Sequence, residues 1–133
     1  MRKEKIKVLE IAPMEAPKIC YLEPTRKAFQ KAINMGASNK GETEAKKLGK
    51  QTYAIFNKDR FLANLTPNRR IGDDIIAGMM YVVAVNENKV PVSLTEKQIK
   101  EYALRFWSIE AFDDMDVAEA NINTLLSRLW KDE

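Results

Sequence analysis

The 133-residue sequence has no histidine and a single cysteine, Cys20. Without imidazole ligands and with one thiol, the usual zinc and copper sites cannot be assembled, and neither can a Ser-His-Asp or Cys-His nucleophilic system. A lone cysteine also excludes an internal disulfide, and its place in the apolar run 19–22 favours a small buried hydrophobe. Carboxylate chemistry is the remaining route to catalysis. The sequence therefore predicts no metal, no cofactor and no enzymatic activity.

Glycine and long apolar runs are also scarce. The five glycines lie at positions 36, 41, 49, 72 and 78, too scattered for a Walker phosphate loop or a Gly-x-Gly-x-x-Gly turn. No apolar run of signal-peptide length follows the charged start 1–5, and nowhere do about 18 consecutive apolar residues occur. Apolar residues at 45% and charged residues at 31% are typical of a globular domain. We expect a cytoplasmic protein that does not interact with membranes.

Charge is unevenly distributed along the chain. Residues 24–71 contain eleven Lys/Arg and three Asp/Glu, a local charge of +8, whereas residues 72–133 contain six and twelve, a local charge of −6. One interpretation is that the two parts attract each other or form solvated faces. The other is a basic surface for phosphate-bearing or acidic partners.

The N-terminal part predicts a hairpin followed by a helix. Alternating charged and apolar residues over 5–11 indicate a half-buried strand, and 18–22 is a second strand joined to it by a short connection. Pro24 and Thr25 then begin a helix that ends at Gly36 and buries Phe29, Ala32 and Ile33. Residues 37–51 contain almost no apolar residues, and we expect a flexible basic loop there, with one helical turn at 43–48.

The middle of the chain is rich in strand formers. The runs 52–56 and 61–65 flank the polar segment 57–60, which predicts an antiparallel pair joined by a turn. The segment 75–85 is apolar and β-branched, which favours one central strand, and Gly78 within it indicates a bulge or a close backbone approach.

The C-terminal part predicts two helices. Thr95 and Gln98 form a capping box, and Ile99, Tyr102, Ala103 and Phe106 follow at helical spacing on the face expected to pack on the sheet. A second helix is predicted from the capping pair Asp116 and Glu119. Its apolar stripe, which would dock on its own domain or on a second copy to form a homodimer, consists of Ile122, Leu125, Leu126, Leu129 and Trp130.

These elements together predict an α+β fold, a small and mostly antiparallel sheet packed by two to three helices in a single domain. Residues 1–107 form the expected core domain. Residues 108–133 form a C-terminal helical extension.

Several short motifs resemble those of domain-of-unknown-function family thirty-eight forty-six over roughly residues 5–107. They are Pro67-Asn68-Arg69, Asp74-Ile75-Ile76-Ala77-Gly78 and the helix start Ser93-Leu94-Thr95. The resemblance implies a small protein carried by phages, plasmids or integrative elements, often encoded beside antirestriction genes, with no activity attached. The lysine-rich segment 37–51 and the extension after Trp107 depart from the family pattern.

The segment 67–74 is the most informative candidate site, because two arginines and two aspartates directly precede the most apolar run. We expect a displayed polar loop, in which Asn68, Arg69 and Arg70 recognise phosphate or carboxylate groups. Alternatively, one arginine pairs with Asp73 or Asp74 and Asn68 caps the turn. If the loop is a contact surface, replacing both arginines with alanine should change stability by less than about 1 kcal/mol. The complete predicted binding set is Asn68, Arg69, Arg70, Asp73, Asp74, Lys46, Lys47 and Lys50.

Three functions follow from these features. The first, which the resemblance implies, is a non-enzymatic counter-defence protein of a mobile element that binds a host immune protein or a signalling nucleotide. The second is a nucleic-acid-binding module, which would use Arg26, Lys27, Lys31, Lys46, Lys47, Lys50, Arg69 and Arg70. The third, least favoured, is a Mg²⁺-dependent hydrolase built on Asp73 and Asp74.

Overall fold

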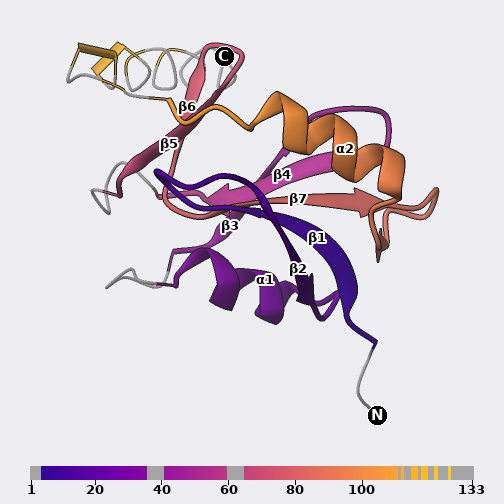
Figure 1. Cartoon of the computed structure of the whole chain (residues 1–133). Helices are drawn as coiled ribbons and strands as arrows, with labels where there is room; N and C mark the ends of the chain where they lie inside the picture. Colours follow the sequence, from indigo (N-terminus) through magenta and orange to yellow (C-terminus); the bar gives the residue numbers. More distant parts are fainter. Residues whose placement is uncertain are drawn as a thin grey trace.

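The computed structural model describes residues 4–35, 41–59 and 65–110, together with positions 112, 115, 116, 118, 119, 122 and 126. Its main sheet has the strand order β2-β1-β7-β4-β3, with β8 paired to the end of β7, and every pairing is antiparallel (Figure 1). The strands are β1 (Ile6–Ile11), β2 (Lys18–Leu22), β3 (Thr43–Lys47), β4 (Thr52–Asn57), β7 (Met80–Val85) and β8 (Pro91–Val92). Strands β5 (Pro67–Ile71) and β6 (Asp74–Ala77) form a separate hairpin.

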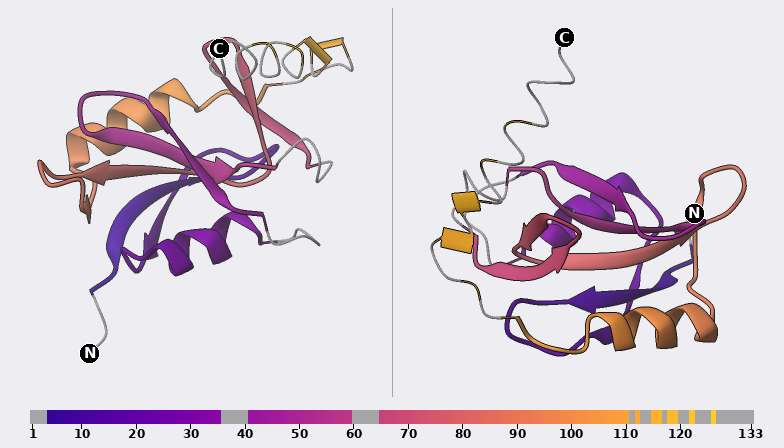
Figure 2. Two further views of the ribbon diagram at one scale, coloured as in Figure 1. Left: turned by 180° about the vertical axis from the view of Figure 1, so that it is seen from behind. Right: turned by 90° about the horizontal axis from the view of Figure 1, so that it is seen from above.

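The two helices, α1 (Arg26–Ile33) and α2 (Glu96–Arg105), lie on opposite faces of the main sheet (Figures 1 and 2). Helix α1 begins at the N-cap Thr25 and buries Phe29, Ala32 and Ile33 as predicted. Helix α2 begins with the predicted capping box of Thr95 and Gln98. The described part of the chain is therefore an α+β fold with a mostly antiparallel sheet and two helices, none of them long and apolar enough to span a membrane.

Each face of the sheet has its own apolar core. Because side chains alternate along a strand, Val8 of β1 and Tyr81 of β7 pack with α1, whereas Leu9 and Val82 pack with α2. Strand β7 is buried along nearly its whole length, as expected for a central strand. The half-buried Cys20 packs against the α1 core, and burial raises the pKa of its thiol.

The predicted flexible loop at 37–51 is wrong for its central part, because Thr43–Lys47 is strand β3 and contains no helical turn. This strand needs few apolar residues because it lies at the edge of the sheet, where lysine is common, and pairs through its main chain with β4. Strand β4 pairs with β3 along one edge and with β7 along the other. The predicted partner segment of 52–56, residues 61–65, lies outside the described residues except for Leu65. Residues 37–40 and 61–64 lie outside the described residues.

The predicted single strand at 75–85 is divided into β6 and β7. The break contains Gly78, whose φ of +77° lies in the left-handed region. A Cβ atom there would lie 2.8 Å from Cδ1 of Leu65. The prediction of a close backbone approach at Gly78 is thus confirmed, and the break allows β5 and β6 to fold over the α2 face, where Ile71 and Ile76 join the core.

Most of the predicted last helix lies outside the described residues, including Leu125, Leu129 and Trp130. The described positions of that segment are helical, and Ile122 and Leu126 are 56% and 39% exposed. Docking of this segment on its own domain or on a second copy stays a prediction.

Tyr81 and Glu10 form a buried polar pair on the α1 face, and this pair makes the stability of the protein change with pH in the alkaline range. The Tyr81 hydroxyl donates to Oε1 of Glu10 at 2.9 Å, and Lys18 lies 3.0 Å from the other oxygen of that carboxylate. Burial, and then the Glu10 hydrogen bond and charge, raise the pKa of Tyr81 far above its usual value.

The resulting prediction concerns Tyr81→Phe. The folded state disfavours the charged phenolate form of Tyr81, whereas the unfolded chain loses the phenol proton at pH about 10. The contribution of Tyr81 to the free energy of unfolding is therefore complete below pH about 10, and above that pH it falls by at most about 1.4 kcal/mol per pH unit. We expect the variant to lose about 1 kcal/mol at neutral pH and the difference from wild type to shrink above pH about 10. The free energies of unfolding of wild type and variant in urea, at neutral pH and above pH about 10, measure this difference. A difference that is constant with pH would contradict it.

Candidate anion-binding site

The β5–β6 hairpin carries the residues that the sequence singled out. Its turn is formed by Gly72 and Asp73, and Gly72 has a φ of +60°, as a two-residue turn of type II′ requires at its first position. The register shifts between Pro67 and Arg69, which pair with consecutive residues of β6. The extra residue of this bulge allows two consecutive side chains, Asn68 and Arg69, to be buried together.

Arg69 is buried within the fold, with 1% of its surface exposed. Its Nε donates to the main-chain oxygen of Phe106 at 3.0 Å, and Nη2 donates to that of Glu15 at 2.7 Å. Nη1 donates to the main-chain oxygen and to Oδ1 of Asn68, at 3.2 and 2.8 Å. Burial lowers the pKa of Arg69 from its usual value, while the charge of Glu110 opposes that shift.

Asn68 extends the same network toward the main sheet. It is 1% exposed, and its Nδ2 donates to the main-chain oxygens of Ile11 at 2.7 Å and Gly78 at 2.8 Å. Asn68 and Arg69 thus connect the end of β1, the β6–β7 break and the end of α2. Their predicted role in an exposed contact surface is wrong, because the bulge turns both inward.

The alternative in which the segment serves the fold is correct for these two residues. The hydrogen-bond partners that this alternative predicts are wrong. The side chains of Asn68 and Arg69 bind main-chain carbonyl groups rather than the adjacent aspartates.

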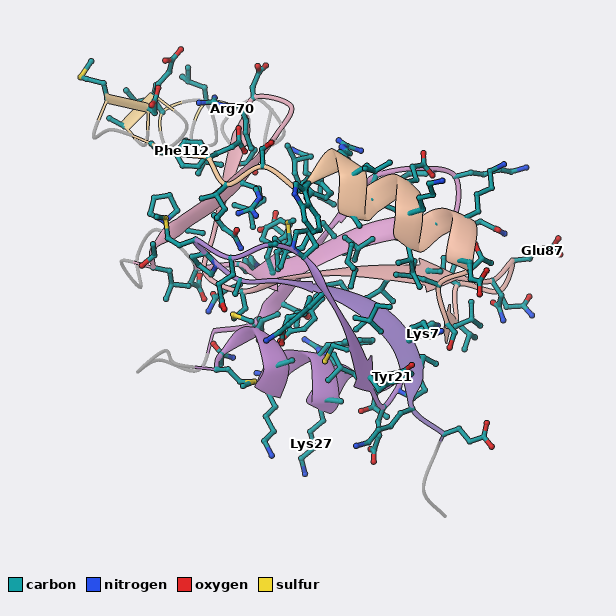
Figure 3. The ribbon with its side chains drawn as sticks, in the orientation of Figure 1. Lys7, Tyr21, Lys27, Arg70, Glu87 and Phe112 are labelled. Atoms are coloured by element: carbon teal, nitrogen blue, oxygen red, sulfur yellow. The ribbon has the colours of Figure 1, made fainter. Side chains whose placement is uncertain are left out.

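Arg70 points the other way and is exposed. Its main-chain N–H donates to Oε2 of Glu110 at 2.6 Å, and its guanidinium lies 5.6 Å from the ring centre of Phe112 and 3.9 Å from Oδ1 of Asp116. Figure 3 shows Arg70 and Phe112 beside each other at the hairpin. The chain that follows α2 therefore lies against the outer side of β5.

An open hollow of about 260 Å³ lies between the hairpin and the end of α2. We call it the arginine hollow, and it is lined by Arg69, Arg70, Arg105, Phe106, Ser108 and Glu110. Among the described residues that line it, three are arginines and one, Glu110, is acidic. Arg105 is exposed and lies 5.1 Å from the ring centre of Phe106. Such a set of donors suits phosphate or carboxylate oxygens.

The other predicted binding residues do not line this hollow. Asp74 pairs with Lys46 of β3 at 3.9 Å, and Asp73 is exposed in the hairpin turn. Lys47 and Lys50 are exposed in and after β3. Within the described residues, no group of three or more His, Cys, Asp or Glu side chains is placed to hold a metal ion.

The binding set predicted from the sequence lacks four of the six lining residues, namely Arg105, Phe106, Ser108 and Glu110. Helical spacing predicts that Arg105 points outward from α2, and it does, but nothing in the sequence connects it with an arginine of β5. No local pattern marks Glu110, whose role depends on a contact with a residue 40 positions earlier in the chain.

No family model, curated protein or solved structure matches this chain. The resemblance to domain-of-unknown-function family thirty-eight forty-six therefore stays a prediction.

Proposed function

We propose that this protein is a non-enzymatic binding protein that recognises an anionic group of its partner, a phosphate or a carboxylate, in the arginine hollow. The observation that carries the proposal is that three arginine residues line one open hollow. Arginine presents planar donor pairs that match both kinds of anion, and its charge persists at all physiological pH values.

The three arginines have different parts in this proposal. Arg69 is fixed by its four hydrogen bonds to protein oxygens and supplies a buried positive charge at the wall of the hollow. Arg70 and Arg105 are exposed, and an anion bound by Arg70 would compete with its 3.9 Å contact to Asp116. The ligand would therefore contact Arg70 and Arg105, and Arg69 would act through its charge.

Glu110 acts as an internal substitute for the ligand. Its carboxylate lines the hollow and accepts a hydrogen bond from the main chain of Arg70, at a place where an external anion would be attracted. An incoming anion must compete with this carboxylate, which favours ligands of higher charge, such as a phosphate chain.

Titration calorimetry with inorganic pyrophosphate tests the proposal. We expect saturable binding at low salt, and a loss of at least about tenfold in affinity for Arg70→Ala or Arg105→Ala, because a charge-assisted hydrogen bond contributes about 1.5–3 kcal/mol. Lys97→Ala is the matched control, since it removes an exposed cation of α2 that does not line the hollow. Absence of binding, or equal losses in all three variants, would refute the proposal.

Glu110→Gln should raise the affinity for pyrophosphate. The amide keeps an oxygen for the Arg70 N–H but removes the competing charge, an effect of about 1 kcal/mol between partly exposed charges and thus about fivefold in affinity. Calorimetry of wild type and variant at the same ionic strength measures the change. Unchanged affinity would show that Glu110 does not occupy the ligand position.

A counter-defence role is the form of this function that the resemblance to mobile-element proteins supports. The anion would then belong to a signalling nucleotide or to an acidic surface of a host immune protein. Affinity capture from bacterial cells tests this role, with wild type and the Arg70→Ala, Arg105→Ala double variant as baits. A host defence protein or nucleotide captured only by wild type would support it, whereas identical captures would exclude the hollow as the contact.

A further inference from the structure

The two edges of the main sheet differ in the side chains that they carry. Among the described strands, β3 ends the sheet on one side and carries Lys46 and Lys47, and lysines on an edge strand oppose pairing with another chain. Strand β2 ends it on the other side, and its only charged residue, Lys18, lies 3.0 Å from Glu10 of its own chain. The β2 edge therefore lacks the lysines that protect the β3 edge.

The main-chain groups of Ile19 and Tyr21 point away from the sheet. Tyr21 pairs with Lys7 of β1. The N–H and C=O of Lys7 bind Ser93 and Leu94, at 2.9 Å each, on the β7 side of β1. Lys7 and Tyr21 are thus a non-hydrogen-bonded pair, in which the main-chain groups of both residues point away from the partner strand. The same holds for Ile19, two positions earlier, and neither residue has a main-chain partner on this side among the residues that the structure describes.

The side chains of the same two residues form an uncovered apolar surface. Ile19 pairs with Leu9 of the α2 core, so Ile19 and Tyr21 lie on the α2 face of the sheet. Helix α2 does not cover them, because they are 50% and 55% exposed. Outward main-chain donors and acceptors therefore coincide with exposed apolar side chains at one edge.

We propose that β2 pairs antiparallel with β2 of a second copy of this chain, around a twofold axis at Cys20. In this register, Ile19 of each copy lies opposite Tyr21 of the other, and each such pair exchanges two main-chain hydrogen bonds. The main sheets of the two copies become one continuous sheet. No residue of β2 lines the arginine hollow, and the proposal does not depend on anion binding there.

The residues of β2 favour this register and a second copy of the same strand. Shifting the partner strand by two residues would bring in Pro17, which has no N–H, or Glu23, whose main-chain oxygen already accepts a hydrogen bond from Thr25. The charges are compatible, because Lys18 lies opposite Leu22 of the copy and no charged residue of β2 faces a like charge. Opposed pairs of an aromatic and a β-branched side chain, formed twice here, stabilise antiparallel strands.

Sedimentation equilibrium over a concentration series tests the proposal. We expect a reversible monomer–dimer equilibrium. The dissociation constant should rise at least about tenfold in the Ile19→Lys, Tyr21→Lys variant, because like charges would then lie opposite each other. Val90→Lys, Leu104→Lys is the matched control, since it adds the same charges at two exposed apolar residues outside β2 and should leave the equilibrium unchanged. A monomer at every concentration, or equal effects of the two variants, would overturn the proposal.

Tyr21→Pro tests the main-chain pairing itself. Proline removes an N–H that the monomer does not use, and it is tolerated on edge strands at such positions. We expect the variant to sediment as a monomer while its far-UV circular dichroism spectrum stays that of wild type. A dimer that persists in this variant would contradict pairing at β2.

Cys20 reports the register, because it is the only cysteine. It would face its copy across the axis at a Cα separation of about 4.5 Å, which lies within disulfide range. Copper-phenanthroline takes up the two electrons that two thiols release with their protons, so it should link the copies by a disulfide. The Cys20→Ser, Lys47→Cys variant carries its one thiol on the more exposed β3 edge and should be linked far more slowly. A dimer that is not linked at Cys20, or is linked no faster than this control, would overturn the proposed pairing.

Discussion

Arg69→Ala is expected to lower the free energy of unfolding by about 3 kcal/mol. The substitution leaves the main-chain oxygens of Phe106 and Glu15 without their buried donors, and it deprives Asn68 of a partner on both of its oxygens. Each buried acceptor left unsatisfied costs about 1–3 kcal/mol, and the cavity left by the side chain adds to that cost. Urea unfolding followed by far-UV circular dichroism measures the change.

Arg70→Ala is the matched control, since it removes the same side chain from the adjacent position of β5. Its guanidinium is exposed and contacts one carboxylate at 3.9 Å and one aromatic ring, so the expected change is below about 1 kcal/mol. Similar effects of the two substitutions would contradict the description of Arg69. The expectation that both arginines can be removed at little cost, which follows from the sequence alone, applies to Arg70 only.

Asn68→Leu should cost about 2–3 kcal/mol. Leucine has a similar size but no donors, so the main-chain oxygens of Ile11 and Gly78 lose their hydrogen bonds in a buried setting, and Nη1 of Arg69 loses the Oδ1 acceptor. The free energy of unfolding in urea is again the measurement. A cost below about 0.5 kcal/mol would mean that the hairpin is held by its apolar side chains instead.

The Asn68→Leu, Arg69→Ala double variant shows whether the two residues act together. Both side chains belong to one network, so the double variant should lose less than the sum of the single losses. Strictly additive losses would mean that the two side chains stabilise the hairpin independently.

The parts of the fold that the sequence predicts well are those set by local rules. The β1–β2 hairpin follows from the alternation in 5–11, and α2 follows from the capping box of Thr95 and Gln98, because both signals involve neighbouring residues. The buried face of α1 follows from helical spacing in the same way. In each case, the interactions that define the element lie within a few positions of one another.

The errors arise where distant partners decide the structure. Strand β3 has no apolar signal of its own and forms because β4 supplies main-chain partners along its edge. The bulge that buries Asn68 and Arg69 depends on carbonyl groups of Ile11, Glu15 and Phe106, which are far away in the sequence. Neither the residue composition of a segment nor its hydrophobic periodicity indicates that buried carbonyl acceptors lie nearby in the fold. In sequence, a strand that buries an asparagine and an arginine therefore resembles a polar loop.

The same limit applies to the candidate site. The sequence neighbours of Arg70 identify it as a candidate, whereas Arg105 and Glu110 join it only because the end of α2 packs against the hairpin. The sequence thus indicates one exposed arginine of the hollow, Arg70, and the fold supplies the other, Arg105. Lys46, which looks equally available in the sequence, pairs with Asp74 in the structure.

The most direct measurement is an NMR titration of the arginine Nε–Hε signals with inorganic pyrophosphate. If the arginine hollow is the binding site, the signals of Arg70 and Arg105 should shift together and saturably. The signal of Arg69 should shift as well, because Arg69 lines the same hollow. Arg26, on α1 across the sheet, should not move. Saturable binding in which the Arg70 and Arg105 signals stay in place would contradict the central claim that this hollow recognises anions.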